Sequence, residues 1–153
     1  MLRLAAVLFI CLLITGCGGG GTIHDGPSLS VTQLQLVPEQ VDIKGSPCRI
    51  GQQTSLYRNF ISGDGESGGD SLVATVVITC LDPRPVTFVT PTHLWLINGE
   101  EVWESDIPGD EPVARGGPKW SPGSRVDVVV RVADGDGAEY LVRAHDRLVT
   151  GIQ

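Results

Sequence analysis

The stretch RVDVVVRVADGDGAEYLVRA, residues 125–144, is the most informative part of the chain for the fold. Valine occupies every even position from 126 to 132, and three of the four odd positions from 125 to 131 are charged. This period of two is typical of a strand with one buried face. The turn sequence Asp134–Gly137 follows, and a second run with apolar residues begins after it. The stretch therefore predicts an antiparallel β-hairpin.

The turn of this hairpin permits two registers. A two-residue loop would place the valines opposite a set that includes Glu139 and Arg143. A three-residue loop, with Gly137 in the left-handed conformation and a bulge beside it, places Val132 opposite Tyr140 instead. We expect the second register, because it sets apolar side chains against apolar side chains on one face.

Strands are also predicted on both sides of this hairpin, and turn residues separate them. Their expected positions are 30–37, 41–43, 72–80, 86–90, 93–97, 100–104 and 148–152. Thr54–Ile61 is the only helical candidate. Eight or nine short strands in one chain of 153 residues predict a single all-β domain over residues 29–153. The expected architecture is an antiparallel β-sandwich.

Residues 120–144, WSPGSRVDVVVRVADGDGAEYLVRA, resemble the late strands of immunoglobulin-like and fibronectin-type modules. Such modules often have a valine-rich strand, a glycine turn and then a strand with a tyrosine. The resemblance implies an immunoglobulin-like sandwich. It does not imply the antibody type of core, because no tryptophan lies between Cys48 and Cys80.

The run 93–104 predicts a second hairpin around Asn98-Gly99, the preferred pair for a two-residue type I′ turn. This turn would place Trp95 opposite Val102 and Leu94 opposite Trp103. Both faces of the hairpin would then be apolar, and a single core covers only one of them.

Two interpretations of the second face remain open. Either both tryptophans pack, one of them beneath the segment 105–122, or one face stays open as a docking patch for a protein or an apolar ligand. The candidate patch residues are Trp95, Ile97, Val102 and Trp103.

The chain begins with a short targeting segment. Arg3 precedes the eleven-residue apolar run Leu4–Ile14, which is too short for a membrane-spanning helix of about 20 residues. Ile14-Thr15-Gly16-Cys17 follows and resembles the bacterial lipobox. The resemblance implies that residues 1–16 are a cleaved signal peptide and that the Cys17 thiol carries a diacylglycerol, with a further acyl chain on its amino group. The alternative is a coincidental cysteine in an ordinary signal peptide, as Cys11 illustrates.

Residues 17–28 are expected to form the lipidated cysteine and a glycine-rich tether. Two or more acyl chains anchor a protein stably without spanning the bilayer. Gly18 stands where inner-membrane lipoproteins of Gram-negative bacteria commonly have Asp. We therefore expect an exported, membrane-anchored protein, with the outer membrane favoured if the source is Gram-negative.

The charge balance is acidic. The whole chain has 11 Lys and Arg residues against 18 Asp and Glu residues. Residues 1–16 contain Arg3 and no acidic residue, so the mature chain has 10 against 18, a net charge of −8. Such a surface disfavours nucleic acid as a partner. The expected partners are the membrane, through the lipid, and a protein of the cell envelope.

Only Cys48 and Cys80 remain to pair after lipidation of Cys17. An oxidising compartment favours a disulfide between them, with two buried thiols or metal ligation as alternatives. No metal is expected, since there is no C-x-x-C spacing and the three histidines, at positions 24, 93 and 145, are scattered. The acidic loop 62–70 is either a solvated loop or a calcium site, but it lacks the ligand pattern of an EF-hand.

The sequence contains no catalytic set that we can identify. There is no G-x-S-x-G motif, and Asp127, predicted opposite His145, is the nearest approach to an oriented base. We therefore expect a lipid-anchored envelope module with a binding or scaffolding role, without catalysis or a cofactor. An exported inhibitor-like or ligand-binding module, using loops 52–70 and 105–122, is the alternative, and a small hydrolase or metal enzyme is a third.

Overall fold

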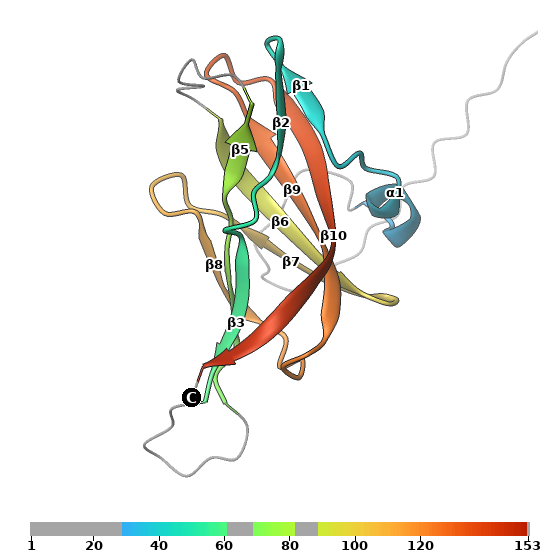
Figure 1. Ribbon diagram of the computed structural model, residues 1–153, viewed down its shortest axis with the longest axis vertical. Coiled ribbons are helices and arrows are strands. Elements are labelled where there is room, and N and C mark those ends of the chain that lie inside the picture. Colours follow the sequence, from blue (N-terminus) through green and yellow to red (C-terminus); the bar gives the residue numbers. More distant parts are fainter. Residues whose placement is uncertain (1–28, 61–68, 82–88, 153) are drawn as a thin grey trace, which may run out of the picture.

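The computed structural model describes residues 29–60, 69–81 and 89–152, which form one short helix and ten strands (Figure 1). The signal segment and tether at 1–28, most of the acidic loop and part of the strand expected at 86–90 lie outside these residues. The elements are α1 (Val31–Gln35), β1 (Val41–Ile43), β2 (Ser46–Ile50), β3 (Ser55–Asn59), β4 (Leu72–Thr75), β5 (Ile78–Cys80), β6 (Thr90–Asn98), β7 (Glu101–Asp106), β8 (Val113–Gly117), β9 (Arg125–Ala133) and β10 (Glu139–Ile152).

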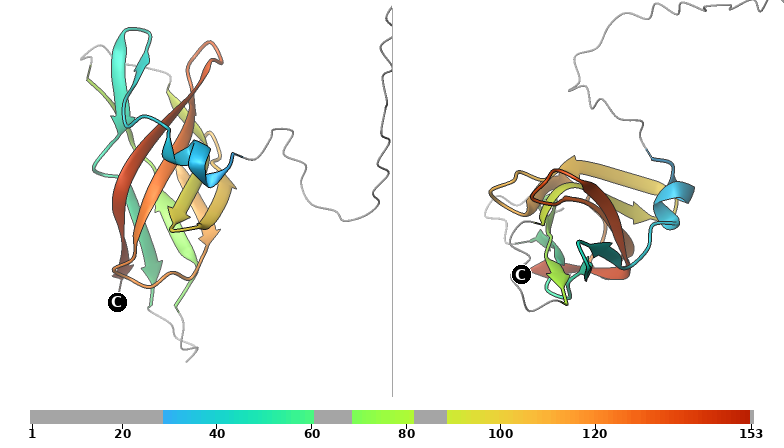
Figure 2. Two further views of the ribbon diagram at one scale, coloured as in Figure 1. Left: turned by 90° about the vertical axis from the view of Figure 1, so that its right-hand side faces the viewer. Right: turned by 90° about the horizontal axis from the view of Figure 1, so that it is seen from above.

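The strands form two sheets, so the fold is all-β and sandwich-like. One sheet has seven strands in the order β7-β6-β9-β10-β3-β4-β8, and the other has three in the order β1-β2-β5. Seen from above in Figure 2, the strands curve around a shared interior. Nearly all pairs are antiparallel, but β10 and β3 are parallel, which corrects the purely antiparallel expectation.

The hairpin β9–β10 has the predicted register. Val132 lies opposite Tyr140 and Val130 opposite Val142, and Gly137 has a φ of 83°. The even-numbered valines of β9 are at most 1% exposed, so they supply a central row of the core. The apolar pairing therefore selected the three-residue loop, as expected from the sequence.

The strand expected at 148–152 is the end of β10. A bulge at His145 and Asp146, where Asp146 has a φ of 59°, bends the strand without ending it. After the bulge, β10 continues beside β3, with Val149 opposite Leu56. One long strand thus joins the β9 side of the sheet to the β3 side.

The run 72–80 is divided between the two sheets. β4 pairs with β3 and β8, whereas β5 pairs with β2 in the small sheet. The change occurs at Val76 and Val77, whose amides donate to Pro112 O and Thr54 Oγ1 instead of to a neighbouring strand. The predicted inward face is nevertheless confirmed in β4, where Leu72 and Ala74 are fully buried.

Two local predictions were wrong. Residues 31–35, expected in a strand, form α1, because Ser30 and Gln33 make a capping box that satisfies the first free amides of a helix. Thr54–Ile61, the helical candidate, contains strand β3. Strand β8 lies in the segment 105–122, for which no strand was predicted.

No helix among the described residues is long and apolar enough to cross a membrane.

Candidate functional site

The β6–β7 hairpin has a different register from the one predicted. Asn98 lies opposite Glu101, so the turn residues are Gly99 and Glu100. Gly99 has a φ of 63°, and positive φ at the first turn position alone is the pattern of a type II′ turn. This register pairs Ile97 with Val102, whereas the predicted one would have placed Ile97 opposite a glutamate. Apolar pairing outweighed the local preference of Asn-Gly.

The two registers differ by two residues, so the membership of each face is unchanged. Trp95, Ile97 and Val102 share the outer face, while Leu96 and Trp103 face the main core. Trp103 is half-buried there. The faces were therefore predicted correctly although the pairing was not.

Helix α1 covers the outer face of this hairpin. Leu34 and Val37 pack against Trp95, Ile97 and Val129 in a second apolar cluster. Both Trp95 and Ile97 are 3% exposed, and Leu34 is fully buried. The covering segment is thus 29–37 and not 105–122.

The four candidate patch residues consequently do not form an open docking surface. Trp95 and Ile97 lie beneath α1, Trp103 faces the opposite side, and Val102 alone is exposed, at 36%. The physical reason is the capped helix, which presents Leu34 to the face that the sheet leaves uncovered. Both tryptophans are therefore packed, as the first of the two interpretations expected. The segment that covers the outer face is 29–37, however, and not 105–122.

Polar side chains border the covered face. The Trp95 Nε1 atom donates to Glu104 Oε2 at 2.8 Å, and His93 Nδ1 lies 2.7 Å from Asp106 Oδ1. The Arg131 guanidinium lies over the Trp95 ring at 5.2 Å from its centroid. These contacts fix the two aromatic rings in place. The polar side chains at the edge of this apolar cluster therefore have a structural role in the hairpin.

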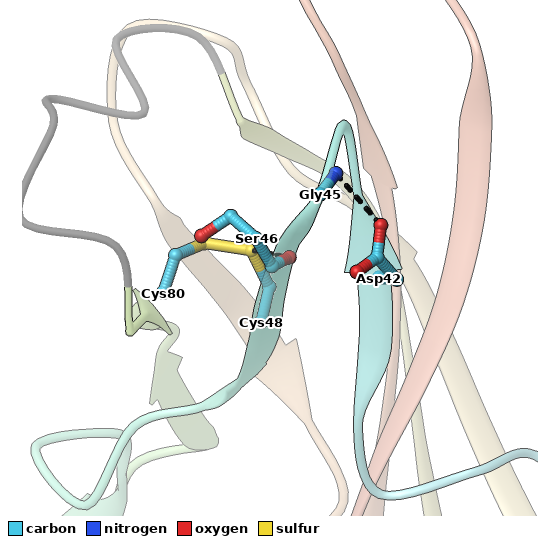
Figure 3. The surroundings of a disulfide bond; sticks show 5 residues. All are labelled: Asp42, Gly45, Ser46, Cys48 and Cys80. Atoms are coloured by element: carbon cyan, nitrogen blue, oxygen red, sulfur yellow. Dashed lines mark hydrogen bonds between the residues drawn. A yellow bond between two sulfur atoms is a disulfide. The ribbon is translucent and has the colours of Figure 1, made fainter.

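The predicted disulfide is present and joins β2 to β5 (Figure 3). Cys48 and Cys80 lie directly opposite each other, with their Cα atoms 4.0 Å apart. Cys48 is fully buried in the main core. At the nearby turn between β1 and β2, Gly45 N donates to Asp42 Oδ1 at 2.8 Å. The disulfide therefore links β2, the central strand of the small sheet, to its edge strand β5.

Ion pairs join the β1–β2 turn to the β9–β10 turn at the same end of the domain. Lys44 Nζ lies 3.5 Å from Asp134 Oδ2 and 2.5 Å from Asp136 Oδ2. Burial acts to raise the pKa of Asp134, but hydrogen bonds from the Ala138 and Asp136 amides, together with the Lys44 charge, lower this pKa below 3.8. The aspartate thus stays ionised and holds the β9–β10 turn.

An open recess lies between β2, β10 and the segment that precedes β1. It encloses about 320 Å³ and is lined by Glu39, Arg49, Ile50, Gln52, Arg143, Ala144, His145, Asp146 and Arg147. Five of these residues, 143–147, belong to the part of β10 that contains the bulge. We call it the arginine recess. No pattern in the sequence indicated it.

The three arginines of the recess have no carboxylate partner among the described residues. Arg147 donates to the Ile50 and Gly51 carbonyls, and Arg143 donates to the Gln35 carbonyl. The Nε atom of Arg143 is buried and makes no hydrogen bond. Arg49 is exposed and, within the part of the chain that the structure describes, its side chain forms no hydrogen bond or ion pair.

The two carboxylates of the recess contact groups other than its three arginines. Asp146 Oδ2 lies 2.7 Å from Arg125 Nη1, and Glu39 Oε1 lies 3.2 Å from His145 Nε2. His145 Nδ1 also lies 3.2 Å from Asp127 Oδ2, the neighbour predicted for it. His145 is therefore placed between two carboxylates, and its Nε2 atom also lies 2.5 Å from Arg143 Nη2. Three arginines and two carboxylates line the recess, and none of the three arginines pairs with either carboxylate.

No group of three or more His, Cys, Asp or Glu side chains suited to a metal ion occurs in residues 29–60, 69–81 and 89–152. The chain matches no family model, and neither a curated protein nor a solved structure matches it. Its function is therefore inferred from its own residues.

Proposed function

We propose that this chain is a lipid-anchored module of a bacterial cell envelope and acts by binding, not by catalysis. The observation that carries the proposal is Ile14-Thr15-Gly16-Cys17 at the end of an apolar run of signal-peptide length. The lipid on Cys17 would hold the domain at the membrane, and the outer membrane is favoured in a Gram-negative source because Gly18 follows the cysteine.

The cysteines of the folded domain support export. Cys48 and Cys80 are bonded to each other, and disulfides persist mainly in oxidising compartments outside the cytosol. Because these two cysteines satisfy each other, Cys17 has no disulfide partner in the domain. The two observations are independent, since one comes from the signal segment and the other from the fold.

The tether sets how far the domain lies from the membrane. Residues 18–28 separate Cys17 from Leu29, which packs beside α1. A glycine-rich coil of this length has a root-mean-square span of roughly 17–20 Å. The domain would therefore work close to the lipid surface and contact partners that lie there.

We also propose that the domain is a distant variant of the immunoglobulin-like sandwich. The order β7-β6-β9-β10 corresponds to the C′-C-F-G order of variable-type immunoglobulin sheets. The domain differs in that β3, β4 and β8 continue the same sheet, and in that the disulfide lies in the small sheet. An experimental structure in which β7-β6-β9-β10 did not form one side of the sandwich would reject this relationship.

A ligand-binding role is the second candidate, and the arginine recess favours it over the hairpin. The hairpin's apolar outer face is covered by α1, whereas the recess is open and is lined by three arginines against two carboxylates. Binding of a ligand in the recess is compatible with anchoring. Isolation of the protein from detergent-solubilised envelopes, followed by identification of what is retained, would separate a stable protein complex from a soluble ligand.

The anchor is tested by labelling cells with radioactive palmitate. We expect the wild-type chain and Cys11→Ser to be labelled, because Cys11 lies inside the apolar run and is removed with it. Cys17→Ser should lose the label and accumulate as the uncleaved precursor. Labelling of Cys17→Ser, or an unlabelled wild-type chain, would contradict the proposal.

A further inference from the structure

We propose that the arginine recess binds a small solute through an oxyanion group, a carboxylate or a phosphate, held by Arg49, Arg143 and Arg147. This goes beyond the proposed anchoring role, because it gives the folded domain a ligand class of its own. It depends on the domain alone, so a failure of the lipid anchor would leave it standing.

The charge distribution is the first reason. Three positive side chains line the recess of a chain whose net charge is −7, and none of them has a carboxylate partner in the described ranges. The two acidic residues of the wall are engaged by Arg125 and His145. The wall therefore carries three arginines against two carboxylates, and a concave surface with an excess of positive charge attracts anions and raises their local concentration.

The hydrogen-bonding capacity is the second reason. Arg49 makes no contact that would occupy its guanidinium, and Arg143 buries an Nε–H without an acceptor. A buried donor normally has a partner, so an orphaned one requires an explanation. Guanidinium groups match the planar, two-oxygen geometry of carboxylate and phosphate, which makes them the usual ligands of both.

The size and construction of the recess are the third reason. About 320 Å³ is at the lower end of the range for pockets that bind small molecules. Two of the arginines come from β10 and the third comes from β2, across the boundary between the two sheets. Arg147 donates to the carbonyls of Ile50 and Gly51, so this arginine both supplies charge and links the β10 wall to the end of β2.

The test is a titration of the purified full chain, in neutral detergent, with inorganic phosphate and separately with succinate. Ionic strength is held constant with sodium chloride, because screening alters charge interactions. Calorimetry gives the dissociation constant, and amide NMR shifts locate the site. We expect saturable binding of at least one anion, with shifts at Arg49 and at residues 143–147. Preference for phosphate or succinate identifies which oxyanion the solute carries.

Arg49→Gln is the informative variant, since Arg49 is exposed and supports no other contact of the described residues. Loss of one charged hydrogen bond should weaken binding about tenfold or more. Arg115→Gln is the matched control: Arg115 is also exposed, but it lies on β8 and pairs with Glu111. It should leave binding unchanged.

Three results would overturn the proposal. The first is that neither anion binds saturably to the wild-type chain. The second is that the NMR shifts lie away from the recess. The third is that Arg115→Gln weakens binding as much as Arg49→Gln does. The second result is independent of any variant, so a misfolded variant would not leave the question open.

Discussion

Reduction of the Cys48–Cys80 disulfide should lower the free energy of unfolding by about 3–4 kcal/mol. The two cysteines are 32 residues apart, and the loop that they close contains β3, β4 and β5's first residues. A covalent link of this span restricts the unfolded chain, which loses the entropy of a loop of that length. The folded small sheet holds the pair directly opposite each other in any case, so the effect falls mainly on the unfolded state.

For a domain of this size, each kcal/mol corresponds to roughly 3–4 °C in melting temperature, so the melting temperature should fall by about 10–15 °C. The assay is calorimetric melting of the full chain with and without a phosphine reductant. Cys48→Ala/Cys80→Ala provides the control, because its melting temperature should not respond to the reductant. A decrease below about 3 °C in the reduced wild-type chain would refute the loop-entropy account, since it corresponds to about 1 kcal/mol.

Two further predictions concern packing and pH. Leu34→Ala should destabilise the domain by about 2–4 kcal/mol in denaturant unfolding, because Leu34 is fully buried against Trp95, whereas Leu36→Ala, at an exposed position, should change it by less than about 0.5 kcal/mol. Equal effects of the two would mean that α1 does not cover the hairpin. The pKa of Asp134 is lower in the folded chain than its ordinary 3.8, so its contribution to stability is complete above pH 3.8 and is lost as the pH falls through the folded value. Asp134→Asn should therefore lose less stability than the wild-type chain between pH 5 and strongly acidic pH, and parallel acid-unfolding curves would contradict this role.

The strands that the sequence predicted correctly are those in which apolar pairing decides the register. In the β9–β10 hairpin, the valine row admits one good partner row, and the structure adopts it. The β6–β7 hairpin follows the same rule, but the prediction relied on the turn preference of Asn98-Gly99 and placed Ile97 opposite a glutamate. Comparing the cross-strand pairs of both hairpins in the same way would have found the correct register.

Helix α1 was missed although its signal is local. Residues 30–37 alternate in a way that suits a strand, but Ser30 and Gln33 also have the spacing of a capping box. The preference for a helix is decided by the tertiary contact of Leu34 with Trp95 and Ile97. A segment of five helical residues depends on such packing, because isolated short helices are unstable.

The remaining differences are non-local. The division of 72–80 between two sheets depends on partners at Thr54 and Pro112, and the parallel pairing of β10 with β3 joins residues nearly 100 positions apart. The arginine recess has the same origin, because its arginines meet only when β2 and β10 come together. A local sequence pattern does not specify which distant strands lie side by side. The disulfide was predictable because elimination left two cysteines for one bond.

The most direct test of the proposed anchor is the intact mass of the protein isolated from the cell envelope. The mass should correspond to residues 17–153, with a diacylglycerol and a further acyl chain on Cys17, and with two hydrogens fewer for the Cys48–Cys80 bond. A chain that retains residues 1–16, or one that begins elsewhere with an unmodified Cys17, would contradict the lipid-anchored account.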